Sequence, residues 1–133
     1  MDSENRSIDE DIARALAKFP LVLAILFGSV AKGTARPDSD LDIGVSMGRP
    51  LEMNEKMEMI EALAELTGRP VDLVDLYPAP EPLLGEVLRH GRRILGGDAE
   101  FAKLITRHLI EEADFMPYKR RILAERRAAW IGE

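Results

Sequence analysis

The chain has 133 residues, of which 46% are hydrophobic and 32% are charged, a length and composition typical of one folded domain with a single substantial core. Its formal net charge of −6 argues against a general nucleic-acid binder, and the lack of cysteine excludes disulfides and thiolate metal sites. No apolar run approaches the 18 residues or so of a membrane span, and the acidic N-terminal sequence is unlike an export signal, so we expect a cytoplasmic protein.

The chain begins with a predicted helix and a predicted strand. Ser7 and Glu10 form a capping-box pattern ahead of an apolar repeat of helical period, which predicts a helix over residues 8–19. Pro20 is expected to end this helix. The continuous apolar run 21–27 is typical of a strand buried on both faces.

A second strand and a second long helix follow. Residues 41–45 predict the strand, and residues 51–67 repeat apolar side chains at helical spacing until Gly68, a typical C-terminal stop. The apolar residues expected on the buried face of this helix are Met53, Met57, Ile60 and Ala64.

The next segment predicts a strand over residues 71–76, a proline-rich connection, a helix over 83–90 and a short strand over 92–95. Together these elements indicate an α/β fold, with a small mixed sheet and helices packed on one face.

From Asp98 onward the pattern is purely helical. Asp98 is a plausible N-cap, Pro117 is expected to break or kink the helix, and a second charged helix is expected over 119–130. The apolar stripe of the first helix comprises Phe101, Leu104, Ile105 and Leu109. We therefore divide the chain into a core, residues 1–97, and a C-terminal helical arm of the same domain, residues 98–133.

The connection between the first two strands contains the residues best suited to chemistry. In a strand, residues two apart point to the same face, so Asp40 and Asp42 would present two carboxylates side by side. A bare Asp-x-Asp pair is usually solvent-facing, but here it follows the Gly28-Ser29 turn. That turn allows close backbone approach to a phosphate, with a helix expected to start at Val30. Paired carboxylates beside a phosphate site suit Mg²⁺-dependent transfer of a phosphorus group from a triphosphate.

Three other polar residues lie in this connection. Lys32 and Arg36 either contact the triphosphate or are solvated loop charges. Ser39 either orients the loop or contacts phosphate.

Gly28-Ser29 followed by Asp40-x-Asp42 resembles the motif of the polymerase-β-like nucleotidyltransferases, and in particular of the minimal nucleotidyltransferase (MNT) antitoxins that are encoded beside a HEPN toxin. The resemblance extends to Arg69-Pro-Val-Asp72-Leu-Val and to the segment 113–124, so it covers most of the chain.

Transferases of this kind use a third acid on a neighbouring strand, as metal ligand or general base. Asp72 and Asp75 are the candidates, and because they are three residues apart they face opposite sides of a strand. The family resemblance favours Asp72, whereas Asp75 is expected to cap a turn or face solvent.

The resemblance implies a type VII-like antitoxin that transfers AMP from ATP to a tyrosine hydroxyl of its cognate HEPN RNase toxin and so neutralises it. The implied ligands of two Mg²⁺ ions are Asp40, Asp42 and Asp72. The implied nucleotide-binding residues are Gly28, Ser29, Lys32 and Ser39. No membrane and no general nucleic-acid partner are expected.

Three alternatives have different consequences. An antitoxin that acts by binding alone would not need the aspartate motif, which is intact. A nucleotidyltransferase that acts on a small molecule usually has a larger second domain to hold the acceptor. An RNA nucleotidyltransferase is disfavoured by the acidic balance and by the lack of an aromatic stacking platform.

Overall fold

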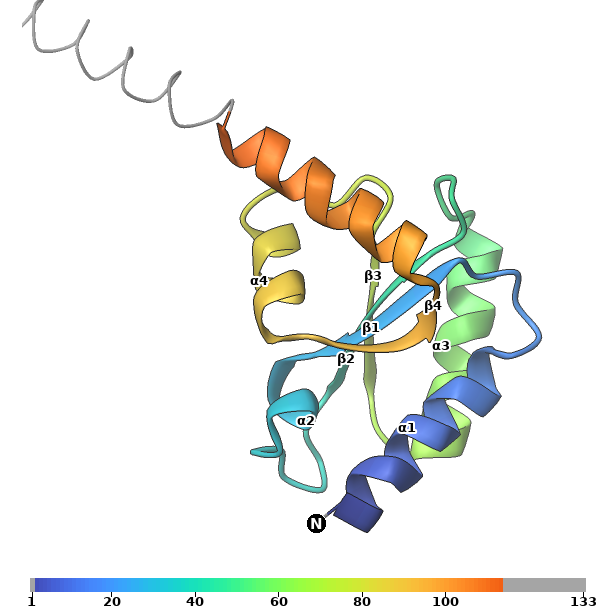
Figure 1. Cartoon of the computed structure of the whole chain (residues 1–133). Helices are drawn as coiled ribbons and strands as arrows, with labels where there is room; N and C mark the ends of the chain where they lie inside the picture. Colours follow the sequence, from blue (N-terminus) through green and yellow to red (C-terminus); the bar gives the residue numbers. More distant parts are fainter. Residues whose placement is uncertain (1, 114–133) are drawn as a thin grey trace, which may run out of the picture.

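The computed structural model describes residues 2–113, with side chains from residue 8 onward, and its centre is a four-stranded sheet in the order β3-β2-β1-β4 (Figure 1). The strands are β1 (Leu23–Phe27), β2 (Leu41–Ser46), β3 (Val71–Asp75) and β4 (Arg92–Gly96). Strand β1 runs antiparallel to both of its neighbours, whereas β2 and β3 are parallel. The predicted mixed sheet is confirmed, including the short fourth strand.

Helices cover both faces of this sheet. The helices are α1 (Asp2–Leu16), the short α2 (Gly28–Lys32), α3 (Met53–Thr67), α4 (Leu83–His90) and a last helix over residues 98–113. Figure 1 shows α1 and α3 on one side of the sheet, with α4 and helix 98–113 on the other. Within residues 2–113, no helix combines the length and the apolarity needed to cross a bilayer.

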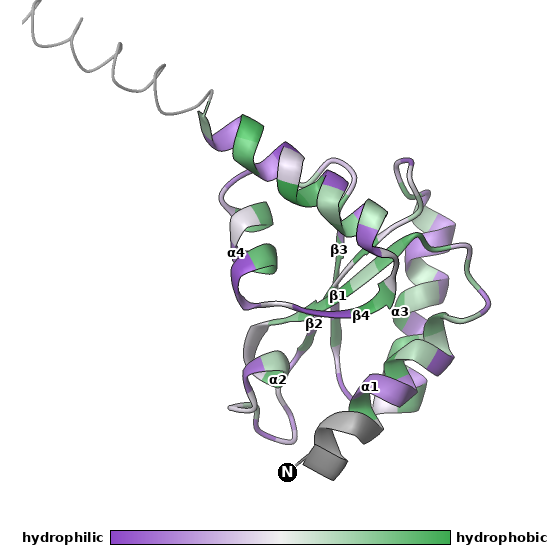
Figure 2. Cartoon of the chain, in the orientation of Figure 1, coloured by the Kyte–Doolittle hydropathy of each residue, from purple (hydrophilic) through white to green (hydrophobic). Residues whose placement is uncertain are grey.

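Strand β1 supplies side chains to both layers, as its unbroken apolar run predicted. Ala24 and Leu26 belong to the core under α1 and α3, whereas Leu23 and Ile25 belong to the core under α4 and helix 98–113. Figure 2 shows β1 as hydrophobic in the middle of the molecule and β4 as partly hydrophilic, and the helices on either side carry residues of both kinds. The expectation of helices on one face is therefore correct for α1 and α3 but missed the second layer.

The predicted start of the first helix is wrong. Helix α1 already includes Ser7, so this residue is not an N-cap, and the helix ends at Leu16. No proline or glycine precedes Ser7, so nothing in the sequence stops the helix from extending toward the N-terminus. The chain then turns through a hydrogen bond from Phe19 N to Leu16 O of 3.1 Å.

The predicted buried face of α3 is displaced around the helix. Met59 and Leu63 are fully buried, whereas Met53 and Met57 are 74% and 58% exposed. Both sets recur at helical spacing, so the pattern offers two overlapping stripes, and packing on the sheet selects one. The predicted stop is confirmed, since Gly68 adopts the left-handed conformation with φ 69°.

Helix 98–113 packs onto the sheet through part of its predicted stripe. Leu104 is buried and Phe101 packs beside it, but Ile105 and Leu109 are 36% and 58% exposed. Asp98 lies inside the helix and pairs with Arg93, so its predicted role as N-cap is wrong.

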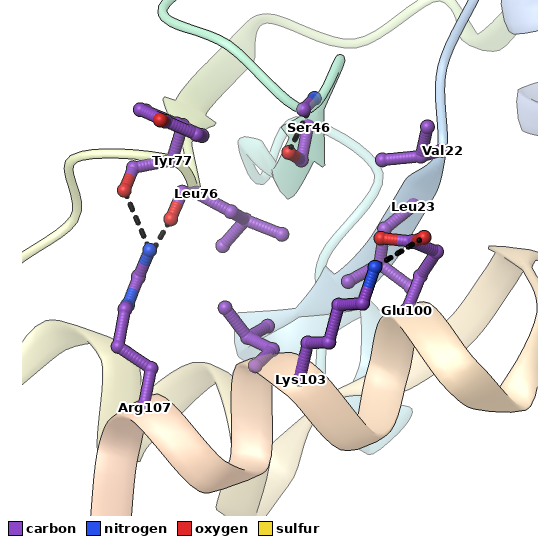
Figure 3. A pocket seen from close by; sticks show the side chains of 10 residues that line it. Val22, Leu23, Ser46, Leu76, Tyr77, Glu100, Lys103 and Arg107 are labelled. Atoms are coloured by element: carbon purple, nitrogen blue, oxygen red, sulfur yellow. Dashed lines mark hydrogen bonds and ion pairs between the residues drawn. The ribbon is translucent and has the colours of Figure 1, made fainter. Parts of the chain in front are cut away.

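The same helix is also held by its polar residues. Arg107 donates to the carbonyls of Leu76 and Tyr77 at 2.6 and 2.5 Å, beside a cavity of about 370 Å³ (Figure 3). The break predicted at Pro117 and the helix predicted over 119–130 lie outside the described residues, and the division at residue 97 stays a prediction.

Candidate active site

The ends of three adjacent strands bring the predicted site residues together. In the antiparallel pair of β1 and β2, Phe27 is opposite Asp42, so Gly28 follows at the same end of the sheet. In the parallel pair of β2 and β3, Asp42 is opposite Asp72. Gly28, Asp42 and Asp72 therefore form a row across neighbouring strands, and Asp40 lies just before β2.

Asp75 is engaged elsewhere. Its carboxylate accepts hydrogen bonds from the backbone N–H groups of Leu51 at 2.8 Å and of Tyr77 at 3.0 Å. These bonds hold the start of the α3 segment and the turn after β3, at the far end of the strand from Asp72. Asp75 thus has the capping role expected for it, and Asp72 is the acid beside Asp42.

Gly28 is required at its position for two reasons. Its φ of +74° lies in the left-handed region, and a Cβ at this position would overlap the carboxylate oxygen Oδ2 of Asp42. Helix α2 begins at Gly28 rather than at Val30 as predicted, and Phe27 forms its extended N-cap. The absent side chain therefore leaves room for the Asp42 carboxylate directly against the Gly28-Ser29 turn.

The electrostatics of the site favour a cation. Burial raises the pKa of Asp42 above its ordinary value, and the negative charges of Asp72 and then Asp40 raise it further. A bound cation would relieve this repulsion, and carboxylate oxygens are the ligands that Mg²⁺ prefers.

The described carboxylates alone do not form a complete set of metal ligands. Among residues 8–113, no three His, Asp or Glu side chains are grouped so that they already hold a metal ion. Asp42 and Asp72 are opposite each other on neighbouring strands, and Asp40 is exposed just before β2, close enough for its charge to act on Asp42. The donor set fits Mg²⁺ in number and chemistry, with substrate phosphate expected to supply further oxygens.

The loop between α2 and β2 is closed by Ser39. Its Oγ accepts from the N–H of Arg36 at 2.8 Å, and its own N–H donates to the Arg36 carbonyl at 3.0 Å. This geometry supports the loop-orienting role for Ser39, one of the two roles left open above. Lys32 is exposed at the end of α2, on the element that carries Gly28 and Ser29.

Arg92, which sequence reasoning missed, joins α2 to α1. Its guanidinium donates to Asp9 Oδ1 of α1 at 2.8 Å and to the Ala31 carbonyl of α2 at 3.3 Å. These partners lie 83 and 61 residues away along the chain, so no local pattern could have revealed the contact.

Comparison with known proteins identifies a family model and a relative that are similar to this chain. The family model "Polymerase beta, Nucleotidyltransferase" matches residues 10–100. Over 76 residues the chain is 37% identical to the protein adenylyltransferase MntA of Shewanella oneidensis. That alignment covers 57% of this chain and 55% of MntA, so the chain matches little more than half the length of this relative.

Solved structures share the fold over most of the chain. A chain from a toxin–antitoxin crystal structure with AMP-PNP has a TM-score of 0.77 at 26% identity, covering 88% of this chain and 96% of that one. A minimal nucleotidyltransferase has a TM-score of 0.58 at 32% identity, covering 68% and 92%. A chain from a Shewanella oneidensis complex of tri-AMPylated HEPN toxin with MNT antitoxin has a TM-score of 0.73 at 23% identity, covering 91% and 97%, which shows the shared fold.

Proposed function

The chain belongs to the polymerase beta nucleotidyltransferase family, and on that premise we propose that it is a type VII-like antitoxin that transfers AMP from ATP to a tyrosine hydroxyl of a cognate HEPN toxin. The observation that carries the proposal is the row of Gly28, Asp42 and Asp72 across three strand ends. It is supported by the relative named a protein adenylyltransferase and by the similar toxin–antitoxin structure with AMP-PNP. The cytoplasm, where ATP is available, is the proposed location.

In this proposal the Gly28-Ser29 turn binds the β- and γ-phosphates of ATP through its backbone N–H groups and the Ser29 hydroxyl. Asp40, Asp42 and Asp72 hold two Mg²⁺ ions, which when bound offset negative charge on the attacking and leaving oxygens. Lys32 has the charge and the position to meet the outer phosphates.

Asp72 is proposed to act on the acceptor as well. It is exposed and lies on β3, the edge strand of the sheet, so an incoming hydroxyl can reach it. The hydroxyl gives up its proton to Asp72 while its oxygen attacks the α-phosphorus. The bond from that phosphorus to the bridging oxygen breaks, pyrophosphate leaves with the electron pair, and AMP stays on the acceptor.

The test is the intact mass of the toxin encoded beside this chain, co-expressed with the wild type and with Asp42→Asn. We expect the toxin to gain one or more AMP units with the wild type and none with the variant. Asp75→Asn is the matched control, since it removes an acid from the same strand pair without touching the row. A toxin that is neutralised by the wild type and yet has its unmodified mass would overturn the proposal in favour of an antitoxin that acts by binding alone.

A further inference from the structure

We propose that Arg69 is a positioning residue that holds Asp40 in the site by clamping the loop in front of β2. The proposal rests on the proposed function in one respect, that Asp40 is a ligand of the bound metal. Arg69 itself lies in the turn between α3 and β3 and touches none of the three aspartates in the hydrogen bonds that it makes.

The clamp is a bridge between two carbonyls of the loop. One terminal nitrogen of Arg69 donates to the Arg36 carbonyl at 2.7 Å and to the Ser39 carbonyl at 3.1 Å. Both carbonyls lie at least 30 residues from Arg69 along the chain, so the contact ties two separate segments together. The Ser39 carbonyl belongs to the peptide that leads directly into Asp40.

The next residue completes the attachment from the other side. The Pro70 carbonyl accepts from the N–H of Leu41 at 2.8 Å, and the parallel ladder of β2 and β3 begins there with Leu41 opposite Val71. Consecutive residues, Arg69 and Pro70, thus hold the peptides on both sides of Asp40. The backbone of Asp40 is fixed even though its side chain is exposed.

Within the described part of the chain, no other side-chain hydrogen bond joins residues 36–40 to the rest of the fold, although Ala35 packs against the core. The bonds between Ser39 and Arg36 close a turn inside the loop but do not fix that turn against the sheet. Without the clamp, the turn could open and carry Asp40 away from Asp42. Displacements of about 1 Å in a reactive constellation can cost on the order of 100-fold in rate.

The position of the clamp also bears on Asp72, only three residues further along the chain. One short turn therefore fixes the loop before Asp40 and leads into the strand that carries Asp72. The planar guanidinium suits such a bridge, because it offers several donors in a rigid arrangement, whereas a lysine ammonium is a point charge on a flexible stem.

The experiment compares Arg69→Gln and Arg69→Lys with a matched control, Arg49→Gln. Arg49 also bonds a carbonyl, that of Pro50 at 3.1 Å, and pairs with Glu55, but it lies beyond the opposite end of β2. Two readouts are needed: amide hydrogen exchange at Ser39 and Leu41, and the midpoint of a Mn²⁺ titration in the presence of AMP-PNP.

We expect Arg69→Gln to speed exchange at Ser39 and Leu41 by about 10-fold. The Mn²⁺ midpoint should rise by about 10-fold, in the range found when a residue that orients a metal ligand is lost. Arg69→Lys should restore part of both effects, and Arg49→Gln should leave both unchanged.

Three results would overturn the inference. The first is an Arg69→Gln variant whose exchange rates and Mn²⁺ midpoint equal those of the wild type. The second is an Arg49→Gln variant that changes both quantities as much as Arg69→Gln does. The third applies if Arg69→Gln fails to fold, and is an Arg69→Lys variant with wild-type exchange rates and Mn²⁺ midpoint. Hydrogen exchange needs no toxin and no turnover, so it tests whether Arg69 holds the loop independently of the proposed function. A toxin that stays unmodified with the wild type would count against the proposed function and not against the role of Arg69.

Discussion

At the scale of single residues, the site depends on where each acid finds its partners. Asp42 packs against the bare backbone of Gly28 and faces Asp72 across the ladder, so its charge is crowded and partly desolvated. Asp75 lies on the same short strand as Asp72, and each of its two carboxylate oxygens accepts a hydrogen bond from a backbone N–H group. Acids of equal chemistry thus have different surroundings because of the neighbours that the sheet provides.

This difference predicts opposite effects for two matched substitutions. Asp72→Asn should lower transfer by about 100-fold or more, because a proposed base and metal ligand is lost, with little change in melting temperature. Asp75→Asn should lower the free energy of unfolding by about 1–2 kcal/mol, because the partly buried N–H of Leu51 loses a charged acceptor, with little change in transfer. Initial rates and thermal melts of both variants provide the check, and equal losses of activity would contradict the assignment.

The raised pKa of Asp42 predicts a dependence of stability on pH. A carboxyl whose pKa is raised by folding favours the folded state while it is protonated, and this contribution is lost as the pH rises through the raised pKa. At pH 7 without divalent cations, Asp42→Asn should therefore be more stable than the wild type, by no more than about 1 kcal/mol because solvent screens a half-buried group. Urea unfolding in EDTA should show this gap closing as the pH falls toward 4, and a gap that widens would refute it.

At the scale of elements, the start of α3 shows how a helix end is held without the usual serine or aspartate cap. Glu52 is the N-cap, and Glu55 accepts its N–H at 3.0 Å in a reciprocal capping box. Arg49 binds the same Glu55 carboxylate with two nitrogens, at 2.8 and 2.7 Å. Hydrogen bonding with Arg49 and with the Glu52 backbone lowers the pKa of Glu55 to about 2.

We therefore expect Glu55→Gln to lower the melting temperature by about 2–5 °C at pH 7, the order expected for a lost cap. Because the pKa of Glu55 is lowered by folding, its contribution is present above the ordinary value and is lost as the pH falls toward 2. Thermal melts from pH 7 to pH 3 should show the two proteins converging. A constant difference over this range would mean that packing, and not the charge, is lost.

At the scale of the whole molecule, the sheet carries two cores, and the row of Gly28, Asp42 and Asp72 lies at one end of it. The opposite end of β1 and β3 faces helix 98–113, where Leu104 packs and Arg107 binds the carbonyls after β3 (Figure 3). The helix is thus joined to the sheet far from Asp42. The basic residues that follow, at positions 119–121 and 126–127, lie outside the described part of the chain and belong to a chain that is otherwise acidic.

We predict that truncation after Met116 weakens binding to the toxin and makes the remaining binding less sensitive to salt, because a cluster of five basic side chains is removed. The sheet and helix 98–113 should be unaffected, so transfer to a small hydroxyl acceptor, if measurable, should persist. Calorimetry of the full-length and truncated chains with the toxin at two salt concentrations measures both effects. Unchanged affinity would mean that the tail does not contact the toxin.

Local patterns were sufficient for much of this protein. The strands, the stop at Gly68 and the pairing of a Gly-Ser turn with Asp40-x-Asp42 depend on periodicity and turn chemistry over a few residues, and these are visible in a linear sequence. The family resemblance favours Asp72 over Asp75 as the third acid. The alternation of side chains along a strand shows only that the two residues face opposite sides of the sheet.

The tertiary structure decided what depends on distant partners. The pairing of Asp42 with Asp72, the buried stripe of α3 and the second helical layer are each selected by packing among several options that the sequence leaves open. The bridge from Arg69 to the loop before Asp40 joins residues that are 30 or more positions apart, and no local sequence pattern predicts such a contact. Its existence follows only from the parallel pairing of β2 with β3, which brings the start of one strand beside the start of the other.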